Sequence, residues 1–278
     1  MSFSQQLLSE QALNLTGPLA HRHRVKTFGA GPKILVFSHG LGTDQSSWSK
    51  VIPDLPDLYT AVTFDLPGAG PLLPDDFSPD RYSSIAAYAD DLLALLDELG
   101  IDRCTYVGHS VSGMIGALAS IEAPSLFDRL ILLNASPRYL NDRAYTGGFE
   151  QSDLDALFRA MDDNYQLWVA GFAPMVVGAD TPSAVLDFAD GLLSMRPDVT
   201  AHIARMIFQS DLREFLHLVS VPTLVVQSRG DVAVPEQVGH YLAEHISGSS
   251  LAWFNGAGHL PHLSAPDEVT KVLNAHLS

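Results

Sequence analysis

Short apolar runs rich in β-branched residues alternate along this chain with longer segments whose apolar residues recur at helical spacing. The strand-like runs span residues 24–28, 33–40, 59–65, 104–108, 130–136, 223–231 and 251–259. This alternation predicts a mostly parallel sheet whose two faces are covered by the intervening helices. The sequence therefore predicts an α/β fold with a doubly wound sheet.

Local signals place some of these elements more closely. The sequence GAGP separates the first two runs and predicts a turn, so we expect these runs to pair as a hairpin. Between Ser83 and Leu99 the apolar residues follow helical spacing, and Gly100 stands where a left-handed helix C-cap is needed. A further helix is predicted from about Val111 to Glu122.

A long segment between the fifth and sixth runs interrupts the sheet. Residues 137–208 read almost wholly helical, before strand character returns at Thr223. We therefore predict one α/β domain with an inserted helical lid rather than two domains, its core formed by residues 21–136 and 209–278. Residues 1–20 form an N-terminal extension to which no role is assigned.

Composition excludes several classes of partner. The net charge of -16 and the isoelectric point near 4.8 disfavour nucleic acid and anionic membranes, because both would repel such a surface. No run reaches the roughly 18 uninterrupted apolar residues of a membrane helix. The single Cys104 cannot form an internal disulfide, and the first residues lack the basic and apolar regions of a secretory signal. We therefore expect a cytoplasmic protein.

A serine lies between a predicted strand and a predicted helix, in the sequence YVGHSVSGMIG. A turn of only Gly108, His109 and Ser110 strains the serine backbone and projects its side chain, as in the G-x-S-x-G nucleophile elbow. Ser112 replaces the last glycine and is nearly as small. We predict Ser110 as a nucleophile; the alternative is a tight turn with an idle serine. Cys104, within the strand, is expected in the core.

A serine hydroxyl is a weak nucleophile, so it needs a positioned base and an acid that orients this base. On such an elbow the acid and then the histidine follow the serine along the chain. Asp231 follows the run TLVVQS, and His259 follows the run LAWFN in a glycine-flanked loop. We predict that Ser110, Asp231 and His259 form a catalytic triad. The alternatives are Asp231 as a turn former and His262 as the base.

Backbone donors for a developing oxyanion are predicted at two turns. FSHGLGTDQ follows a strand-like run, and its glycines allow N–H groups to point into the site. We predict the amides of Leu41 and Val111 as the oxyanion hole, since Val111 follows the nucleophile. The alternative for His39 and Gly40 is a turn without this role. No cofactor and no metal are predicted, and the histidines of HRH lack a metal-ligand spacing.

Several strings in this sequence resemble one family. HGLGTDQSSW, GHSVSGMIG, NYQLWVAGFAP and GHLPHLS look like the α/β-hydrolase group that contains bacterial RsbQ-type stress-signalling hydrolases and the plant karrikin and strigolactone receptors. The resemblance runs from about Arg24 to Leu273. It implies the α/β-hydrolase fold, a four-helix lid and a triad matching the three residues predicted above. Ala135 stands where strigolactone receptors tend to carry phenylalanine. In this respect the chain resembles the karrikin-receptor type more closely.

The first lid helix can be predicted from the residues themselves. Ser152 and Asp155 are expected to cap its N-terminus. Apolar residues then recur at helical spacing as far as Trp168, so they form one apolar face. Gly171 and Pro174 are expected to end this helix.

A lid above the nucleophile must also wall the ligand pocket with its inward aromatic side chains. We therefore predict Trp168 and Phe172 as pocket residues, together with His109 beside the nucleophile and Ala135. The sequence offers no cationic cluster to hold a charged acid, so a small, mainly apolar, neutral ester or lactone is the expected ligand. A butenolide ring is implied by the resemblance alone.

Two kinds of function are consistent with this site. The first is a serine hydrolase of esterase or lactonase type whose output is its product. The second is a ligand sensor with slow hydrolysis, whose lid movement is read by a partner protein. Ser110 at the elbow excludes the dehalogenases and epoxide hydrolases that use an aspartate nucleophile. Both remaining functions keep the triad.

Overall fold

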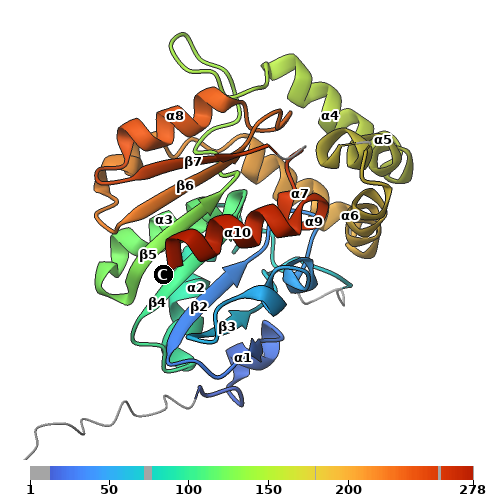
Figure 1. Cartoon of the computed structure of the whole chain (residues 1–278). Helices are drawn as coiled ribbons and strands as arrows, with labels where there is room; N and C mark the ends of the chain where they lie inside the picture. Colours follow the sequence, from blue (N-terminus) through green and yellow to red (C-terminus); the bar gives the residue numbers. More distant parts are fainter. Residues whose placement is uncertain (1–12, 72–76, 179, 256–257, 278) are drawn as a thin grey trace, which may run out of the picture.

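Seven strands form one sheet at the centre of the molecule (Figure 1). The computed structural model describes residues 13–71, 77–178, 180–255 and 258–277. In the described chain the strands are β1 (Lys26–Phe28), β2 (Lys33–Ser38), β3 (Tyr59–Thr63), β4 (Cys104–His109), β5 (Phe127–Leu133), β6 (Thr223–Ser228) and β7 (Ser250–Phe254). Their order is β1-β3-β2-β4-β5-β6-β7, and every neighbouring pair except β1 and β3 is parallel. The predicted mostly parallel sheet is confirmed.

The predicted hairpin of the first two strands is wrong. β1 lies antiparallel to β3, whereas β2 lies parallel between β3 and β4. All but the first residue of β2 are buried, so β2 needs a neighbour on each side, while the partly exposed β1 suits the sheet edge. Gly31 lets the connection cross the start of β3, since a Cβ there would lie 2.1 Å from the Leu58 carbonyl carbon.

The pleat of the strands sends alternate side chains into two cores. On β2, Leu35 and Phe37 point to the face that α10 crosses, and Val36 points to the opposite face, which α2 and α3 cover (Figure 1). The covering helices are α2 (Ile85–Glu98), α3 (Val111–Glu122), α8 (Glu236–His245) and α10 (Pro266–Leu277). Both helices predicted on this part of the chain are present, and Gly100 follows α2 with a φ of +71°.

Shorter helical segments fasten the ends of the core. They are α1 (Pro18–Arg22), α9 (Pro261–Ser264) and the 3-10 turns η1 (Gln45–Trp48), η2 (Ile52–Asp54), η3 (Pro124–Leu126) and η4 (Arg213–Leu218). The carboxylate of Glu98 accepts hydrogen bonds from the Leu19 and Ala20 amides, so α1 is anchored to the end of α2. Residues 1–12 of the N-terminal extension lie outside the described residues.

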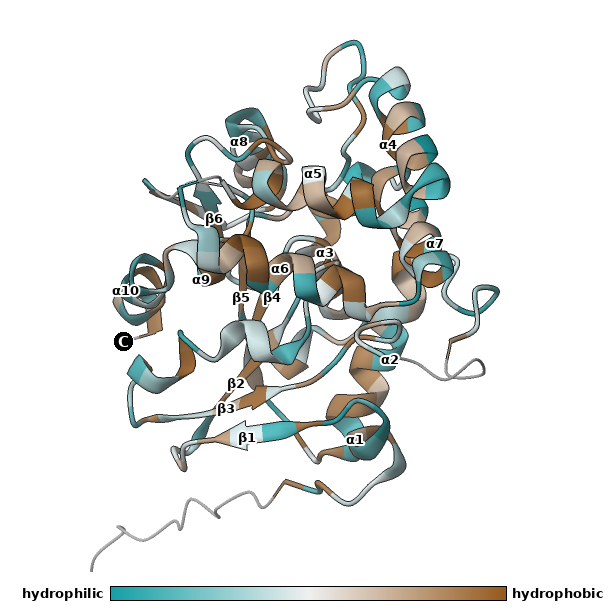
Figure 2. Ribbon diagram, turned by 90° about the vertical axis from the view of Figure 1, so that its right-hand side faces the viewer, coloured by the Kyte–Doolittle hydropathy of each residue, from teal (hydrophilic) through white to brown (hydrophobic). Residues whose placement is uncertain are grey.

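A four-helix insertion connects β5 to β6. It consists of α4 (Gln151–Asp163), α5 (Tyr165–Val177), α6 (Pro182–Ser194) and α7 (Pro197–Phe208). These helices gather at one end of the sheet, as Figures 1 and 2 show from two sides. The helical insertion is confirmed, but residues 137–150 form a loop rather than part of a helix. The Arg138 guanidinium bonds Asp211, which fastens the start of this loop to the chain after α7.

Two details of the predicted lid helix are wrong. Glu150 caps α4 and exchanges hydrogen bonds with Asp153, so Ser152 does not cap it. The predicted single helix is interrupted at Asn164. Its side chain caps α5 by accepting a hydrogen bond from the Leu167 amide at 2.9 Å. Consequently Gly171 and Pro174 lie inside α5 and do not end a helix. Across the described residues, every helix falls short of the length and apolar character that a membrane span requires.

Candidate active site

Ser110 stands in the turn between β4 and α3 with a strained backbone, at φ 57° and ψ -123°. Glycines on both sides make the turn sterically feasible. A Cβ on Gly108 would lie 2.4 Å from the Ser112 carbonyl oxygen, and a Cβ on Gly113 would lie 2.4 Å from the Ala135 Cβ. The turn therefore has the geometry of a nucleophile elbow, as the sequence predicted.

The serine in the last elbow position bonds the elbow to the neighbouring strand. Its hydroxyl, Ser112 Oγ, donates to the His39 carbonyl at 2.5 Å and accepts from Ser38 Oγ at 2.8 Å. A glycine could make neither bond. Ser112 therefore fixes the turn that holds the nucleophile against the loop after β2.

A continuous hydrogen-bonded chain links the three predicted triad residues. Ser110 Oγ lies 2.8 Å from His259 Nε2, and His259 Nδ1 lies 2.7 Å from Asp231 Oδ2. The other carboxylate oxygen, Asp231 Oδ1, accepts from the Ala233 and Val234 amides at 2.8 and 3.0 Å. Since Nδ1 keeps its proton and donates it in a hydrogen bond to the carboxylate, Nε2 is free to accept the serine proton. All three side chains are buried.

The backbone of His259 is held from two directions. Its carbonyl accepts from His109 Nε2 at 2.7 Å and from Asn134 Nδ2 at 3.2 Å. Its amide donates to the Val176 carbonyl in the last turn of α5 at 2.7 Å. The core thus fixes one side of the catalytic histidine, and the lid fixes the other.

His262, the alternative base, does not contact the nucleophile. Its ring is fully buried and stacks on Trp48 with a centroid distance of 4.6 Å. It lies 4.4 Å from the His109 ring, and neither of its nitrogens has a hydrogen-bond partner among the described residues. The alternative role of His262 as the base is therefore wrong, because His262 lies on α9 and its ring packs against Trp48 of η1.

We expect the fold to lose stability as the pH falls from about 7.5 to about 5. Burial lowers the pKa of His39, His109 and His262, the last to about 3, whereas in the unfolded chain an imidazole titrates near 6.5. The unfolded state then binds more protons, so the free energy of unfolding falls by up to about 1.4 kcal/mol per pH unit for each histidine. Urea unfolding across this range measures the slope.

The matched variant for this measurement is His262→Phe, which keeps an aromatic ring on Trp48 and removes one buried titrating group. Its unfolding free energy should depend less steeply on pH than that of the wild type, because the variant takes up about one proton fewer when it unfolds at acidic pH. Equal slopes for the two proteins would contradict the assignment of His262 as a buried neutral imidazole.

The loop predicted to hold an oxyanion donor lies directly against the nucleophile. A Cβ on Gly40 would lie 3.2 Å from the Ser110 Cβ and 2.8 Å from His109 Nδ1. The His39 ring holds this loop, since Nδ1 donates to the Gly40 carbonyl at 2.9 Å and Nε2 accepts from the Leu66 amide at 3.0 Å. Val111 begins α3, so its N–H has no acceptor within the helix.

A cavity lies over Ser110 and beneath the lid. Of the predicted pocket residues, His109 and Phe172 line it. Its wall also includes residues that the sequence analysis did not identify, namely Tyr139, Val176, Phe188, Ile207, Phe208, Ala233 and Leu260. The Tyr139 hydroxyl lies 3.3 Å from Ser110 Oγ. Tyr139 follows β5 by six positions, a spacing that carries no signal for a contact with the nucleophile.

The structure places the other two predicted pocket residues behind this wall. Trp168 stacks on Phe172 with a centroid distance of 4.8 Å, so Phe172 lies between it and the cavity. Ala135 is fully buried below the elbow, against Gly113 of α3. Neither residue lines the cavity among the described residues: Trp168 packs against a residue that does, and Ala135 packs beneath the turn that holds Ser110.

Cys104 lies buried in β4. Burial raises the pKa of Cys104 to about 12, as expected for a core thiol. Within the described part of the chain, no cluster of three histidine, cysteine or acidic side chains is arranged to hold a metal ion.

Comparisons with known proteins agree with this geometry. Residues 35–272 match a model described as "Alpha/beta hydrolase family". Strigolactone esterase RMS3 from Pisum sativum is 49% identical over 94% of this chain and 98% of that protein. Karrikin insensitive 2 receptor CA from Petunia hybrida is 49% identical over 94% and 97%, respectively. Among solved structures, a hydrolase from Oleispira antarctica has a TM-score of 0.89 at 33% identity, covering 94% of this chain and 96% of that one.

Proposed function

Because the chain belongs to the alpha/beta hydrolase family, as its motifs predicted, we propose that it is a serine esterase whose substrate is a small, neutral, apolar ester or lactone. The observation that carries this proposal is the hydrogen-bonded chain from Ser110 through His259 to Asp231 at the base of the cavity. Without a base and an orienting acid, a buried serine would have no catalytic use.

The first half of the reaction transfers the acyl group to the enzyme. Ser110 Oγ attacks the ester carbonyl carbon while its proton passes to His259 Nε2, and the carbonyl oxygen becomes an oxyanion. The amides of Leu41 and Val111 are proposed to stabilise this charge, each being worth about 3 kcal/mol in comparable sites. The intermediate then collapses, and the leaving alcohol takes the proton from His259.

The second half releases the acid. His259 removes a proton from water, the resulting hydroxide attacks the acyl carbon, and the bond to Ser110 Oγ breaks as the serine recovers its proton. Asp231 remains ionised throughout and stabilises the imidazolium that forms twice in the cycle. With a lactone, acylation opens the ring and the freed alcohol remains joined to the acyl group through the former ring carbons, so the second step releases a single hydroxy acid.

The composition of the cavity wall supports the neutral, apolar substrate class. Neither lysine nor arginine is found among the described residues that line it, and aromatic and aliphatic side chains form most of the wall. A carboxylate would lose its hydration there without a compensating charge. A butenolide ring is the specific proposal, supported by the identity to strigolactone esterases and karrikin receptors.

A ligand-sensing function is the second candidate, and one contact favours it. The His259 amide bonds the Val176 carbonyl of α5, and Val176 itself lines the catalytic cavity. A ligand that displaces α5 would therefore move the base as well. Gly258 tightens this coupling, since a Cβ there would lie 2.1 Å from the Val177 carbonyl oxygen.

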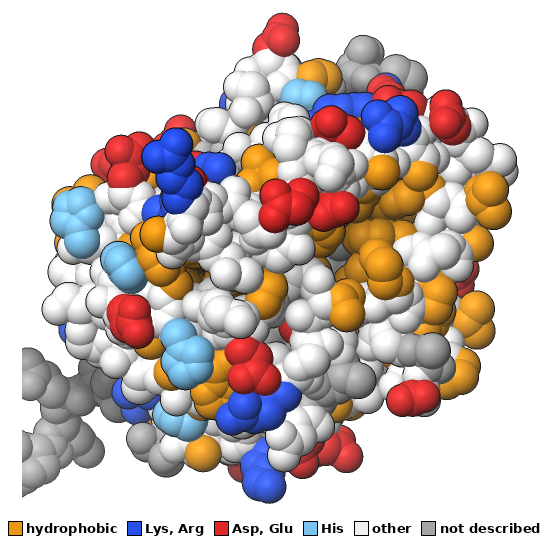
Figure 3. Space-filling model, turned by 90° about the horizontal axis from the view of Figure 1, so that it is seen from above, with side chains coloured by type: hydrophobic (Ala, Val, Ile, Leu, Met, Phe, Trp, Pro, Cys, Tyr) orange, Lys and Arg blue, Asp and Glu red, His pale blue; other side chains and the backbone are white. Residues whose placement is uncertain are grey.

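The outer surface of the lid supports a protein partner for this second function. Leu167 and Met175 of α5 and Leu186 and Leu193 of α6 are exposed. Seen from above, hydrophobic side chains gather on the lid side of the molecule (Figure 3). Contiguous exposed apolar side chains often mark protein contacts. A partner that recognises one lid arrangement could then report the presence of the ligand.

One experiment separates the two functions. We expect the protein to cleave a neutral butenolide ester and to show altered hydrogen exchange across residues 151–178 and 182–208 when this ligand saturates it, because bound ligand contacts α5. Failure to cleave any neutral ester or lactone would contradict the esterase proposal. Fast multiple turnover with unchanged exchange would contradict the sensor and leave an esterase alone.

A further inference from the structure

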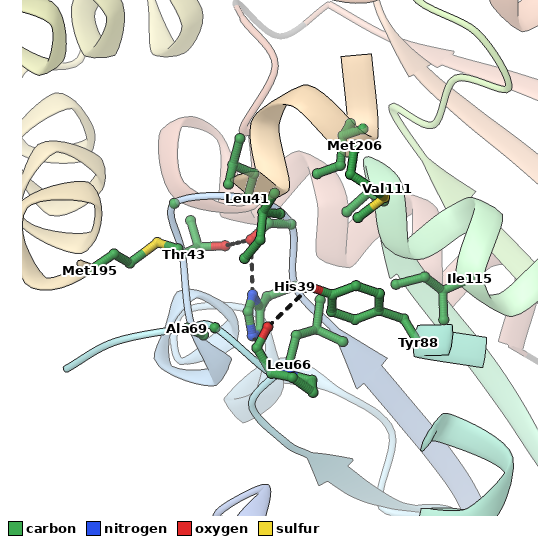
Figure 4. Close-up of a pocket in the computed structure, with 16 residues that line it drawn as sticks. His39, Leu41, Thr43, Leu66, Ala69, Tyr88, Val111, Ile115, Met195 and Met206 are labelled. Atoms are coloured by element: carbon green, nitrogen blue, oxygen red, sulfur yellow. Dashed lines mark hydrogen bonds between the residues drawn. The ribbon is translucent and has the colours of Figure 1, made fainter. Parts of the chain in front are cut away.

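A second cavity, narrow and mainly apolar, is lined in part by the loop that follows β2 (Figure 4). Its wall is formed by the loops after β2 and β3, by α2 and α3, and by the lid helix α7. Apolar side chains in this wall include Leu41, Ala69, Ile115, Met195, Met206 and Ile207. None of the triad residues lines this cavity, so it is distinct from the catalytic cavity described above.

The polar groups of this second cavity already bond one another, as the dashed lines in Figure 4 show. Thr43 Oγ1 donates to the Gly40 carbonyl at 3.0 Å, and the Tyr88 hydroxyl donates to the Pro67 carbonyl at 3.3 Å. Both nitrogens of His39 are also engaged. Apart from His39, whose pKa is lowered by burial, no titratable acid or base such as Asp, Glu, Lys or Arg is found among the described residues of its wall. The cavity therefore suits a hydrocarbon group, because such a group forms no hydrogen bonds.

The two cavities share part of their walls. Leu41 and Ile207 line both of them, and Val111 lines the second. The amides of Leu41 and Val111 are the proposed oxyanion donors, and this proposal places the ester carbonyl beside the wall that the two cavities share. Leu41 is partly exposed and packs against the edge of the core.

The direction of the acyl group follows from the proton that the leaving group needs. His259 supplies this proton, and His259 lines only the catalytic cavity. The leaving alcohol therefore occupies the catalytic cavity. The other substituent of the carbonyl carbon points away from His259, past Leu41 and Val111.

We propose that the second cavity is an acyl-chain subsite, which accepts the hydrocarbon acyl arm of an ester longer than an acetate or an apolar substituent on the acyl side of a lactone. This inference rests on the proposed esterase function. Met195 and Met206 line the subsite, and their flexible thioether side chains can adapt to chains of different shape.

The test compares kcat/KM for the hexanoyl and acetyl esters of p-nitrophenol, which share one leaving group. Ala69→Leu and Met206→Trp each place a larger side chain in the second cavity and so narrow it. Ala233→Leu narrows the catalytic cavity in the same way and is the matched control. We expect the hexanoyl-to-acetyl ratio to fall about tenfold in each of the first two variants and to change less than threefold in the control. The ratio does not depend on the fraction of enzyme that folds.

An unchanged ratio in both Ala69→Leu and Met206→Trp would overturn the subsite, as would a fall confined to Ala233→Leu. In either case hydrolysis of the acetyl ester by the wild type would leave the esterase proposal standing. If the wild type cleaves neither ester, the proposed function fails first and the subsite fails with it.

Discussion

Replacing Ser110 with alanine should lower kcat/KM for a small aryl ester by about 10⁴-fold or more, and the protein should stay folded. The substitution removes the hydroxyl that bonds His259 Nε2 at 2.8 Å, so the base has no nucleophile to deprotonate. Alanine keeps the Cβ, and the strained backbone at this position stays in place, so the melting temperature should change little. The measurements are steady-state hydrolysis of p-nitrophenyl acetate and a thermal unfolding curve.

Ser120→Ala is the matched control for this variant. Ser120 is also buried and belongs to α3, the helix that begins directly after Ser110, but its hydroxyl bonds only the Ala117 carbonyl within α3. The control should hydrolyse the ester at nearly the wild-type rate. A folded Ser110→Ala protein with turnover close to that of this control would refute the assignment of the nucleophile.

Replacing Asp231 with asparagine should lower kcat by about 10⁴-fold. The amide keeps the size of the side chain, so the bonds from the Ala233 and Val234 amides can persist. It removes the negative charge beside His259 Nδ1, and it can present an N–H to that nitrogen, which selects the wrong tautomer of the imidazole. The base is then protonated on the nitrogen that faces Ser110.

Asp180→Asn serves as the control for the acid. Asp180 is exposed between α5 and α6, far along the chain from the strand ends that hold the triad, and it should tolerate this change without loss of activity. A mild effect at Asp231 together with a severe effect at Asp180 would transfer the role of the acid to the lid.

The parts of the site that the sequence predicted are those set by local chain geometry. Ser110 follows a strand and precedes a helix, so the turn between them leaves it few backbone conformations. Asp231 and His259 each follow a strand of the same parallel sheet, and the carboxyl ends of such strands meet at one edge. Chain order and strand register were therefore enough to bring the three side chains together.

The parts that were wrong or missing depend on packing between distant segments. The pairing of β1 with β3 is decided by which strand can lie at an exposed edge, and GAGP predicts a turn for either pairing. The position of Tyr139 against Ser110 depends on how the loop after β5 folds back beneath the lid. Helical spacing showed that Trp168 faces inward, but only the stack on Phe172 reveals which ring reaches the cavity.

The identity of the residue that becomes acylated tests the central claim most directly. The protein is mixed with a p-nitrophenyl ester, quenched in acid during the first turnover, and mapped by peptide mass spectrometry. We expect one acyl group on the peptide that contains Ser110, and none on that peptide in the Ser110→Ala protein. An acyl group on another residue, or hydrolysis that persists in the Ser110→Ala protein, would contradict the proposed mechanism.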